Sequence, residues 1–204
     1  ARERWVRAAH GALLLTIAVG YVAWEAGRLR VLADYYRNPA RPHGAMLRYF
    51  RERGAPRSMA VLSSGHSLAF PLALEVGARY GLRIPSLWPI LTQYDLRDAA
   101  RRGALPISAP HDAAHGVDSL LITMVAHDLG RCAPELLIVP EPRDTLVPNA
   151  ATHAFDYVRY FGADARTAPI IAAYREVARV PDYVILERGG APMACDAAAP
   201  PSSR

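Results

Sequence analysis

The sequence contains no lysine, so all 24 of its basic residues are arginines. This absence excludes a Schiff-base lysine and a Walker-type phosphate loop, both of which require a lysine amine. Only two cysteines are present, Cys132 and Cys195, which excludes a disulfide-dense scaffold or a module with several zinc ions. The two cysteines either pair with each other or remain as two thiols, and the sequence leaves both alternatives open.

Composition narrows the class of protein further. The chain has 204 residues, a net charge of +5 and 51% hydrophobic residues. That apolar fraction excludes a disordered chain, and the length allows one ordinary domain plus one extra element. The arginines are spread over expected helix ends and loops without interleaved aromatic residues, so we expect no nucleic-acid partner.

An apolar run without formal charge occupies residues 8–24 near the start of the chain. Arginines flank it on both sides, and Trp5, Tyr21 and Trp24 bracket it as interfacial aromatic residues do. We expect a transmembrane helix here, with the lipid bilayer as a partner. A buried core helix and a signal peptide are the alternatives that the residues leave open.

The remaining patterns predict a chain divided into four parts. These are a transmembrane helix with its flanks over 1–30, a basic linker over 31–57, an α/β domain over 58–188 and a disordered tail over 189–204. Apolar runs predict strands over 58–63, 82–88, 135–139 and 182–188, and helical spacing predicts helices over 68–80, 95–102, 118–132, 155–161 and 167–180. Such an alternation is typical of a Rossmann-like open, mostly parallel sheet of about four strands with flanking helices.

Polar residues follow two of the expected strands. Ser64, His66 and Ser67 come after the first strand, and Glu141 with Arg143 comes after the strand 135–139. Open α/β sheets bind ligands beyond the carboxyl ends of their strands, so we expect these five residues to bind substrate. A structural turn with a capping serine, and a solvated turn at Glu141, are the competing interpretations.

Two further patterns that contain histidine give weaker evidence for a functional site. His111, Asp112 and His115 have spacing that could hold zinc, but no His-Glu-x-x-His pattern is present and Pro110 with Gly116 places them in a loop. We therefore expect no metal site and no cofactor. His127 and Asp128 lie opposite the apolar stripe of the helix 118–132, which predicts that both are solvated.

The chain resembles the carboxyl-terminal part of bacterial polytopic membrane proteins in three segments, SMAVLSSGHSLAFPLALEVGARYGLRIPSLWPI, PELLIVPEP and PDYVILER. Those proteins are glycosyltransferases of the GT-C, dolichyl-phosphate-mannose-mannosyltransferase-like type. The resemblance covers residues 28–188 and is best over 60–88. It implies a domain on the extracytoplasmic side of the bacterial inner membrane. Their acidic catalytic motif lies in the first external loop, to which nothing in this chain corresponds, so no catalytic residue is carried over.

The resulting functional hypothesis is the terminal domain of a polyprenyl-phosphate-sugar-dependent glycosyltransferase, contributing to acceptor binding. Its expected partners are a polyprenyl-phosphate sugar or a glycan acceptor. One alternative is a membrane-anchored serine hydrolase of the esterase kind that uses Ser64 or Ser67, although the G-x-S-x-G pattern is missing. A second alternative is a non-enzymatic interaction domain of the cell envelope.

Overall fold

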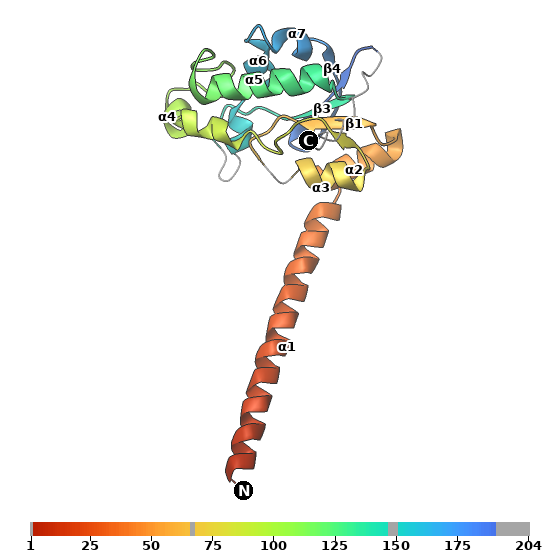
Figure 1. Cartoon of the computed structure of the whole chain (residues 1–204), viewed down its shortest axis with the longest axis vertical. Helices are drawn as coiled ribbons and strands as arrows, with labels where there is room; N and C mark the ends of the chain where they lie inside the picture. The colour runs from red at the N-terminus through yellow and green to blue at the C-terminus, as the bar shows by residue number, and fades with distance from the viewer. Residues whose placement is uncertain (1, 66–67, 147–150, 191–204) are drawn as a thin grey trace, which may run out of the picture.

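The computed structural model describes residues 2–65, 68–146 and 151–190 (Figure 1). One long helix, α1 (Arg2–Arg37), extends away from an α/β domain that contains every other element (Figure 1). Large apolar side chains on the described part of α1 are exposed to solvent, namely Leu14, Leu15, Ile17, Val19, Tyr21, Val22, Trp24, Leu29 and Val31. These side chains therefore add nothing to the cores of the domain.

The expectation of a transmembrane helix is corrected. Within the ranges that the structure describes, no helix is both long and apolar enough to cross a membrane. A span needs roughly 20 predominantly apolar residues. In α1 the run 8–24 is followed by Glu25 and Arg28, and Thr16 and Gly20 interrupt its apolar sequence.

The domain is built on one sheet with the strand order β2-β1-β3-β5-β4. Its strands are β1 (Ser58–Val61), β2 (Arg79–Tyr80), β3 (Leu136–Pro140), β4 (Tyr174–Val180) and β5 (Tyr183–Arg188). Strand β1 is parallel to β2 and β3, whereas β5 is antiparallel to both β3 and β4. The prediction of a mostly parallel, four-stranded Rossmann-like sheet is therefore wrong. The sheet is mixed because its last two strands form a hairpin around Pro181 and Asp182.

Two stretches differ from the elements that were expected. The helix 68–80 is shorter, since α3 (Ala69–Glu75) ends before Gly77, which has a φ of 67°. The chain then enters β2 at Arg79, so the expected strand 82–88 is not formed. The helix 167–180 is limited to α7 (Ala168–Ile171), and the second half of that range is strand β4.

Helices cover both faces of the sheet (Figure 1). On one face lie α2 (Pro42–Arg53) and α3, and a core around Met59, Val61 and Ile138 fills the space beneath them. The opposite face is covered by the 3₁₀-helix η1 (Trp88–Gln93), α4 (Leu96–Arg101), α5 (Gly116–Arg131), the 3₁₀-helix η2 (Ala151–Ala154), α6 (Tyr157–Gly162) and α7. Because α1 joins the domain at α2, the α2–α3 face lies at the base of the long helix (Figure 1).

One charged residue of α5 lies inside the protein, contrary to the sequence prediction. Asp128 is buried, and its carboxylate accepts hydrogen bonds from the backbone N–H of Arg83 at 2.9 Å and lies 2.6 Å from the Arg83 Nε atom. His127 beside it is largely exposed, as expected. Asp128 therefore fixes the loop after β2 against α5.

Candidate functional site

The polar residues after β1 form a hydrogen-bonded cluster with residues from a distant part of the chain. The Ser63 hydroxyl lies 2.8 Å from the Thr152 hydroxyl, and it accepts a hydrogen bond of 3.0 Å from the Gly65 amide. Thr152 belongs to η2, which lies between the expected strand 135–139 and the expected helix 155–161. The first of the two predicted loops is therefore closed by the segment that follows β3.

Ser64 is buried, with 4% of its surface exposed. Its amide donates to the Tyr157 hydroxyl at 2.9 Å, and its carbonyl accepts from the Ser86 hydroxyl at 2.7 Å. Burial raises the pKa of Tyr157, while its hydrogen bonds to Ser64 and Thr152 oppose that shift. The amides of Ser64 and Gly65 both donate within the protein, so neither is free to cradle an anion.

His66 and Ser67, the other predicted residues of this loop, lie outside the described residues. For this reason the part of the substrate-binding prediction that rests on them stays a prediction. The tail 191–204, which includes Cys195, lies outside them as well.

Glu141 and Arg143 bind the β4–β5 hairpin. The Glu141 carboxylate lies 2.7 Å from Arg179 of β4, and its amide donates to the carbonyl of Asp182 at 2.9 Å. Arg143 forms an ion pair with the Asp182 carboxylate. Asp182 has a φ of 66°, the left-handed conformation that an aspartate in a tight turn tolerates. The charges expected to bind substrate thus hold the turn of the hairpin.

The two predicted loops meet through one segment. His153 follows Thr152 in η2, and its Nδ1 atom lies 2.8 Å from the carbonyl oxygen of Glu141. The Arg143 amide donates to the His153 carbonyl at 2.7 Å. The structure therefore brings the carboxyl ends of β1 and β3 together, and η2 is the link between them that the sequence patterns missed.

Catalytic chemistry at this edge lacks a base in the part of the chain that the structure describes. Neither Ser63 nor Ser64 has a hydrogen bond from its hydroxyl to a described imidazole or carboxylate. A nucleophilic serine requires such a base within hydrogen-bond reach. Over the same ranges, no group of three or more His, Cys, Asp or Glu side chains is placed to hold a metal ion.

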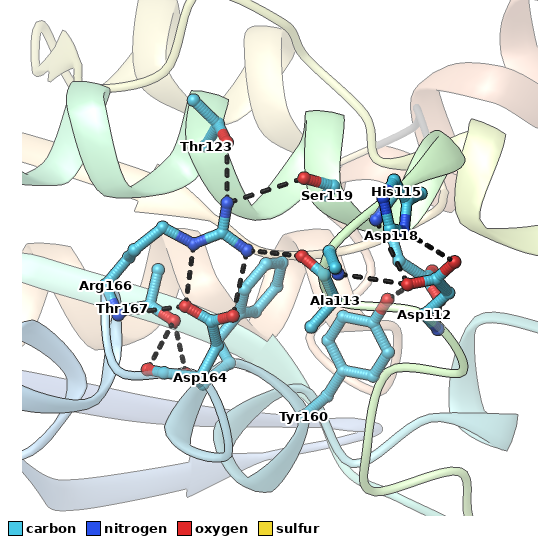
Figure 2. A network of polar contacts seen from close by, with 12 residues as sticks. Asp112, Ala113, His115, Asp118, Ser119, Thr123, Tyr160, Asp164, Arg166 and Thr167 are labelled. Carbon is cyan, nitrogen blue, oxygen red and sulfur yellow. Dashed lines mark hydrogen bonds and ion pairs between the residues drawn. The ribbon is translucent and has the colours of Figure 1, made fainter.

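A second polar cluster organises the loop that contains the histidine pattern. Asp118 of α5 is buried and accepts hydrogen bonds from the hydroxyl of Tyr160 at 2.5 Å and from the amide of Asp112 at 3.1 Å (Figure 2). It also accepts from the hydroxyl of Tyr94 at 3.2 Å and from the amide of His111 at 2.8 Å. All of these donors belong to the protein. The cluster therefore stabilises the loop, and it leaves the Asp118 carboxylate without capacity for a ligand.

Arg166 fixes the same loop from its other side. Its guanidinium donates to the Ala113 carbonyl at 2.7 Å, to the Thr123 hydroxyl at 3.0 Å and to the Asp164 carboxylate at 2.9 Å (Figure 2). The hydrogen bond to Asp164 raises the pKa of Arg166, and the Arg166 guanidinium lowers the pKa of Asp164. The Asp112 carboxylate accepts from the Ala114 and His115 amides at 3.1 Å each, so Asp112 and His115 form a turn.

An open cavity of about 370 Å³ lies between α2 and α3. Its lining combines apolar and charged side chains, namely Leu47, Phe50, Arg51, Ala55, Glu75 and Val76. Behind Glu75 lies His43, which is 2% exposed and whose Nε2 atom is 3.3 Å from the Glu75 carboxylate. The sequence patterns assigned α2 to a basic linker and gave no indication of a cavity beside it.

Comparison of the chain with protein-family models, with curated proteins and with solved structures finds no match.

Proposed function

We propose that this chain is the terminal domain of a glycosyltransferase-type protein and contributes to acceptor binding without carrying the catalytic acid. The observation that carries this proposal is the α2–α3 cavity, which combines a cation, a carboxylate and apolar side chains. That mixture suits a glycan, which offers hydroxyl groups, apolar C–H surface and, in many cases, an anionic group. The assignment to a glycosyltransferase-type protein is the one expected from the sequence of residues 28–188, for which the comparisons find no match.

The contacts between the end of α1 and the start of α2 support a role in which the domain presents its α2–α3 face to a ligand. Asn38 accepts the Arg41 amide at its carbonyl oxygen and the Ala40 amide at its side chain, each at 2.9 Å. A Cβ atom on Gly44 would lie 2.2 Å from the Asn38 carbonyl oxygen, so the start of α2 packs directly on the end of α1. These contacts hold the α2–α3 face in a defined orientation to the long helix.

The strand ends carry no arrangement that favours the hydrolase alternative. Ser63, Ser64, Glu141 and Arg143 make contacts that close loops and fasten a hairpin. Nothing in these contacts favours the serine hydrolase alternative, because no described base reaches either serine hydroxyl.

A binding and transfer experiment tests the proposal. The purified chain is titrated with short glycan acceptors and with a short-chain polyprenyl-phosphate mannose, followed by NMR, and is then incubated with both together. We expect saturable binding of at least one ligand and no sugar transfer. Transfer by this chain alone would contradict the non-catalytic role, and absence of binding to every ligand would contradict the binding role.

Location at the extracytoplasmic side of the bacterial inner membrane, with the lipid bilayer as a partner, belongs to the same proposal. Fractionation of cells that produce the parent protein tests it. Recovery of the parent in the inner-membrane fraction, with this domain cleaved by protease added from the periplasmic side, is the expected result.

A further inference from the structure

The cavity between α2 and α3 has the size and the mixed charged and apolar lining of a binding site for a small ligand. Its volume of about 370 Å³ lies in the range of small-molecule pockets, which is roughly 300–1,000 Å³. We propose that it binds an anionic sugar, a hexose that carries a phosphate or a carboxylate group. This inference rests on the proposed function and names the ligand class and the residues that recognise it.

Arg51 supplies the recognition of the anion. Its side chain is exposed, lines the cavity, and forms no hydrogen bond or ion pair with any described residue. A guanidinium presents parallel N–H donors that match both phosphate and carboxylate oxygens. Several other arginines on the domain surface, among them Arg143, Arg166 and Arg179, form ion pairs with carboxylates of the protein instead.

Glu75 supplies an acceptor for sugar hydroxyl groups. Its side chain is 46% exposed, and its one hydrogen bond or ion pair with a described residue is to His43. Because the carboxylate accepts, the Nε2 atom of His43 carries the proton of this hydrogen bond. The contact holds one carboxylate oxygen against the protein and leaves the other for the ligand.

His43 is a positioning residue for Glu75. It is 2% exposed, and its Nδ1 atom is buried without a hydrogen-bond partner in the described part of the chain. The ring also packs edge-on against Tyr36 of α1 at 4.8 Å between centroids. A buried polar atom left unpaired has a cost, which is consistent with a histidine kept for its other nitrogen.

The wall of the cavity suits the carbon skeleton of a sugar. Leu47, Phe50 and Val76 contribute apolar surface between the two charged side chains. A hexose packs its C–H face on such a surface while its hydroxyl and anionic groups reach the charged rim. A free inorganic anion would use Arg51 alone, so the cavity favours the complete anionic sugar.

Calorimetric titration of the full chain tests the inference. The probes are glucose 1-phosphate, glucuronic acid, glucose and inorganic phosphate. We expect glucose 1-phosphate or glucuronic acid to bind at least tenfold more tightly than glucose or inorganic phosphate. Whichever of these two anionic sugars binds more tightly identifies phosphate or carboxylate as the preferred anionic group. Arg51→Gln is expected to lower the affinity for that anionic sugar by roughly tenfold or more.

Matched variants locate the site. Arg48→Gln makes the same charge change one turn earlier on α2, outside the cavity, and is expected to bind like wild type. His43→Gln retains a side-chain N–H donor and is expected to bind better than His43→Leu, with both variants checked for folding by circular dichroism.

The outcomes separate the two proposals. If an anionic sugar binds but Arg51→Gln has no effect, or Arg48→Gln has an equal one, the cavity assignment is overturned while acceptor binding elsewhere stands. If no probe binds but a longer glycan does, the ligand class is overturned. If neither probes nor glycans bind, both proposals fail.

Discussion

The hydroxyl of Tyr160 donates a hydrogen bond of 2.5 Å to Oδ1 of Asp118, and both side chains are buried. Three further donors complete the environment of this carboxylate, so a buried negative charge is satisfied entirely by hydrogen bonds. These bonds join α5, α6 and the loop after α4. The cluster therefore determines how the helices on one face of the sheet are held together.

Replacing Asp118 by asparagine is expected to destabilise the domain. The amide offers N–H groups where the aspartate accepts, so at least one of the four donors loses its partner. We expect a loss of about 3 kcal/mol in the free energy of unfolding. The midpoint of thermal unfolding then falls by roughly 6–12 °C, measured by circular dichroism.

The control is Asp95→Asn at the start of α4. Asp95 accepts the Asp98 amide at 2.9 Å as a helix cap, a role in which asparagine is about as effective. We expect this variant to unfold within about 0.5 kcal/mol of wild type. Equal effects of the two substitutions would contradict a special role for the Asp118 cluster.

Two half-buried tyrosines predict a loss of stability at alkaline pH. Burial raises the pKa of Tyr80 and of Tyr94 to about 12 in the folded protein, whereas an unfolded tyrosine has a pKa of about 10. Above pH 10 the unfolded chain has therefore lost protons that the folded chain keeps. The stabilisation is complete below about pH 10 and is lost as the pH rises through about 12.

Urea unfolding at a series of pH values measures this loss. Tyr94→Phe is expected to decline less steeply than wild type across that window, although its starting stability is lower because it loses a hydrogen bond to Asp118. Tyr21→Phe, a change at an exposed tyrosine of α1, is expected to follow the wild-type slope. A decline of the same steepness in Tyr94→Phe would show that this residue does not contribute.

The sequence predicted the parts of the fold that depend on buried apolar runs. The apolar runs SMAV, LLIVP and YVILER form strands β1, β3 and β5. The runs of β1 and β3 are buried on both faces of the sheet, and YVILER is buried over its first four residues. Strand β4 was mistaken for a helix. Its exposed Arg175, Glu176 and Arg179 have the spacing i, i+1, i+4, which also fits one face of a helix. The dipeptide Pro181-Asp182 was the available signal for a hairpin.

The candidate site was predicted less completely, since it depends on contacts between distant segments. Glu141 and Arg143 were placed correctly after a strand, but their partners Arg179 and Asp182 come from a hairpin that was not expected. The cavity between α2 and α3 depends on the angle at which two short helices pack. No local pattern around Arg51 or Glu75 encodes that angle.

Gly44→Ala is expected to disrupt the joint between α1 and α2. The new methyl group would lie 2.2 Å from the carbonyl oxygen of Asn38, so backbone must move to accept it. We expect a loss of about 1–3 kcal/mol in urea unfolding and faster tryptic cleavage after Arg37. Gly162→Ala at the end of α6 meets no atom within 4 Å and is expected to leave both measurements unchanged.

A fluorophosphonate probe is expected not to label this chain at Ser64. That serine is 4% exposed, its backbone is bonded to Tyr157 and Ser86, and no described base reaches its hydroxyl. A serine esterase labelled in parallel provides the positive control, and the heat-denatured chain provides the background. Labelling that disappears in Ser64→Ala would restore the hydrolase alternative. Labelling that survives in Ser64→Ala but disappears in Ser67→Ala would instead assign a reactive hydroxyl to Ser67.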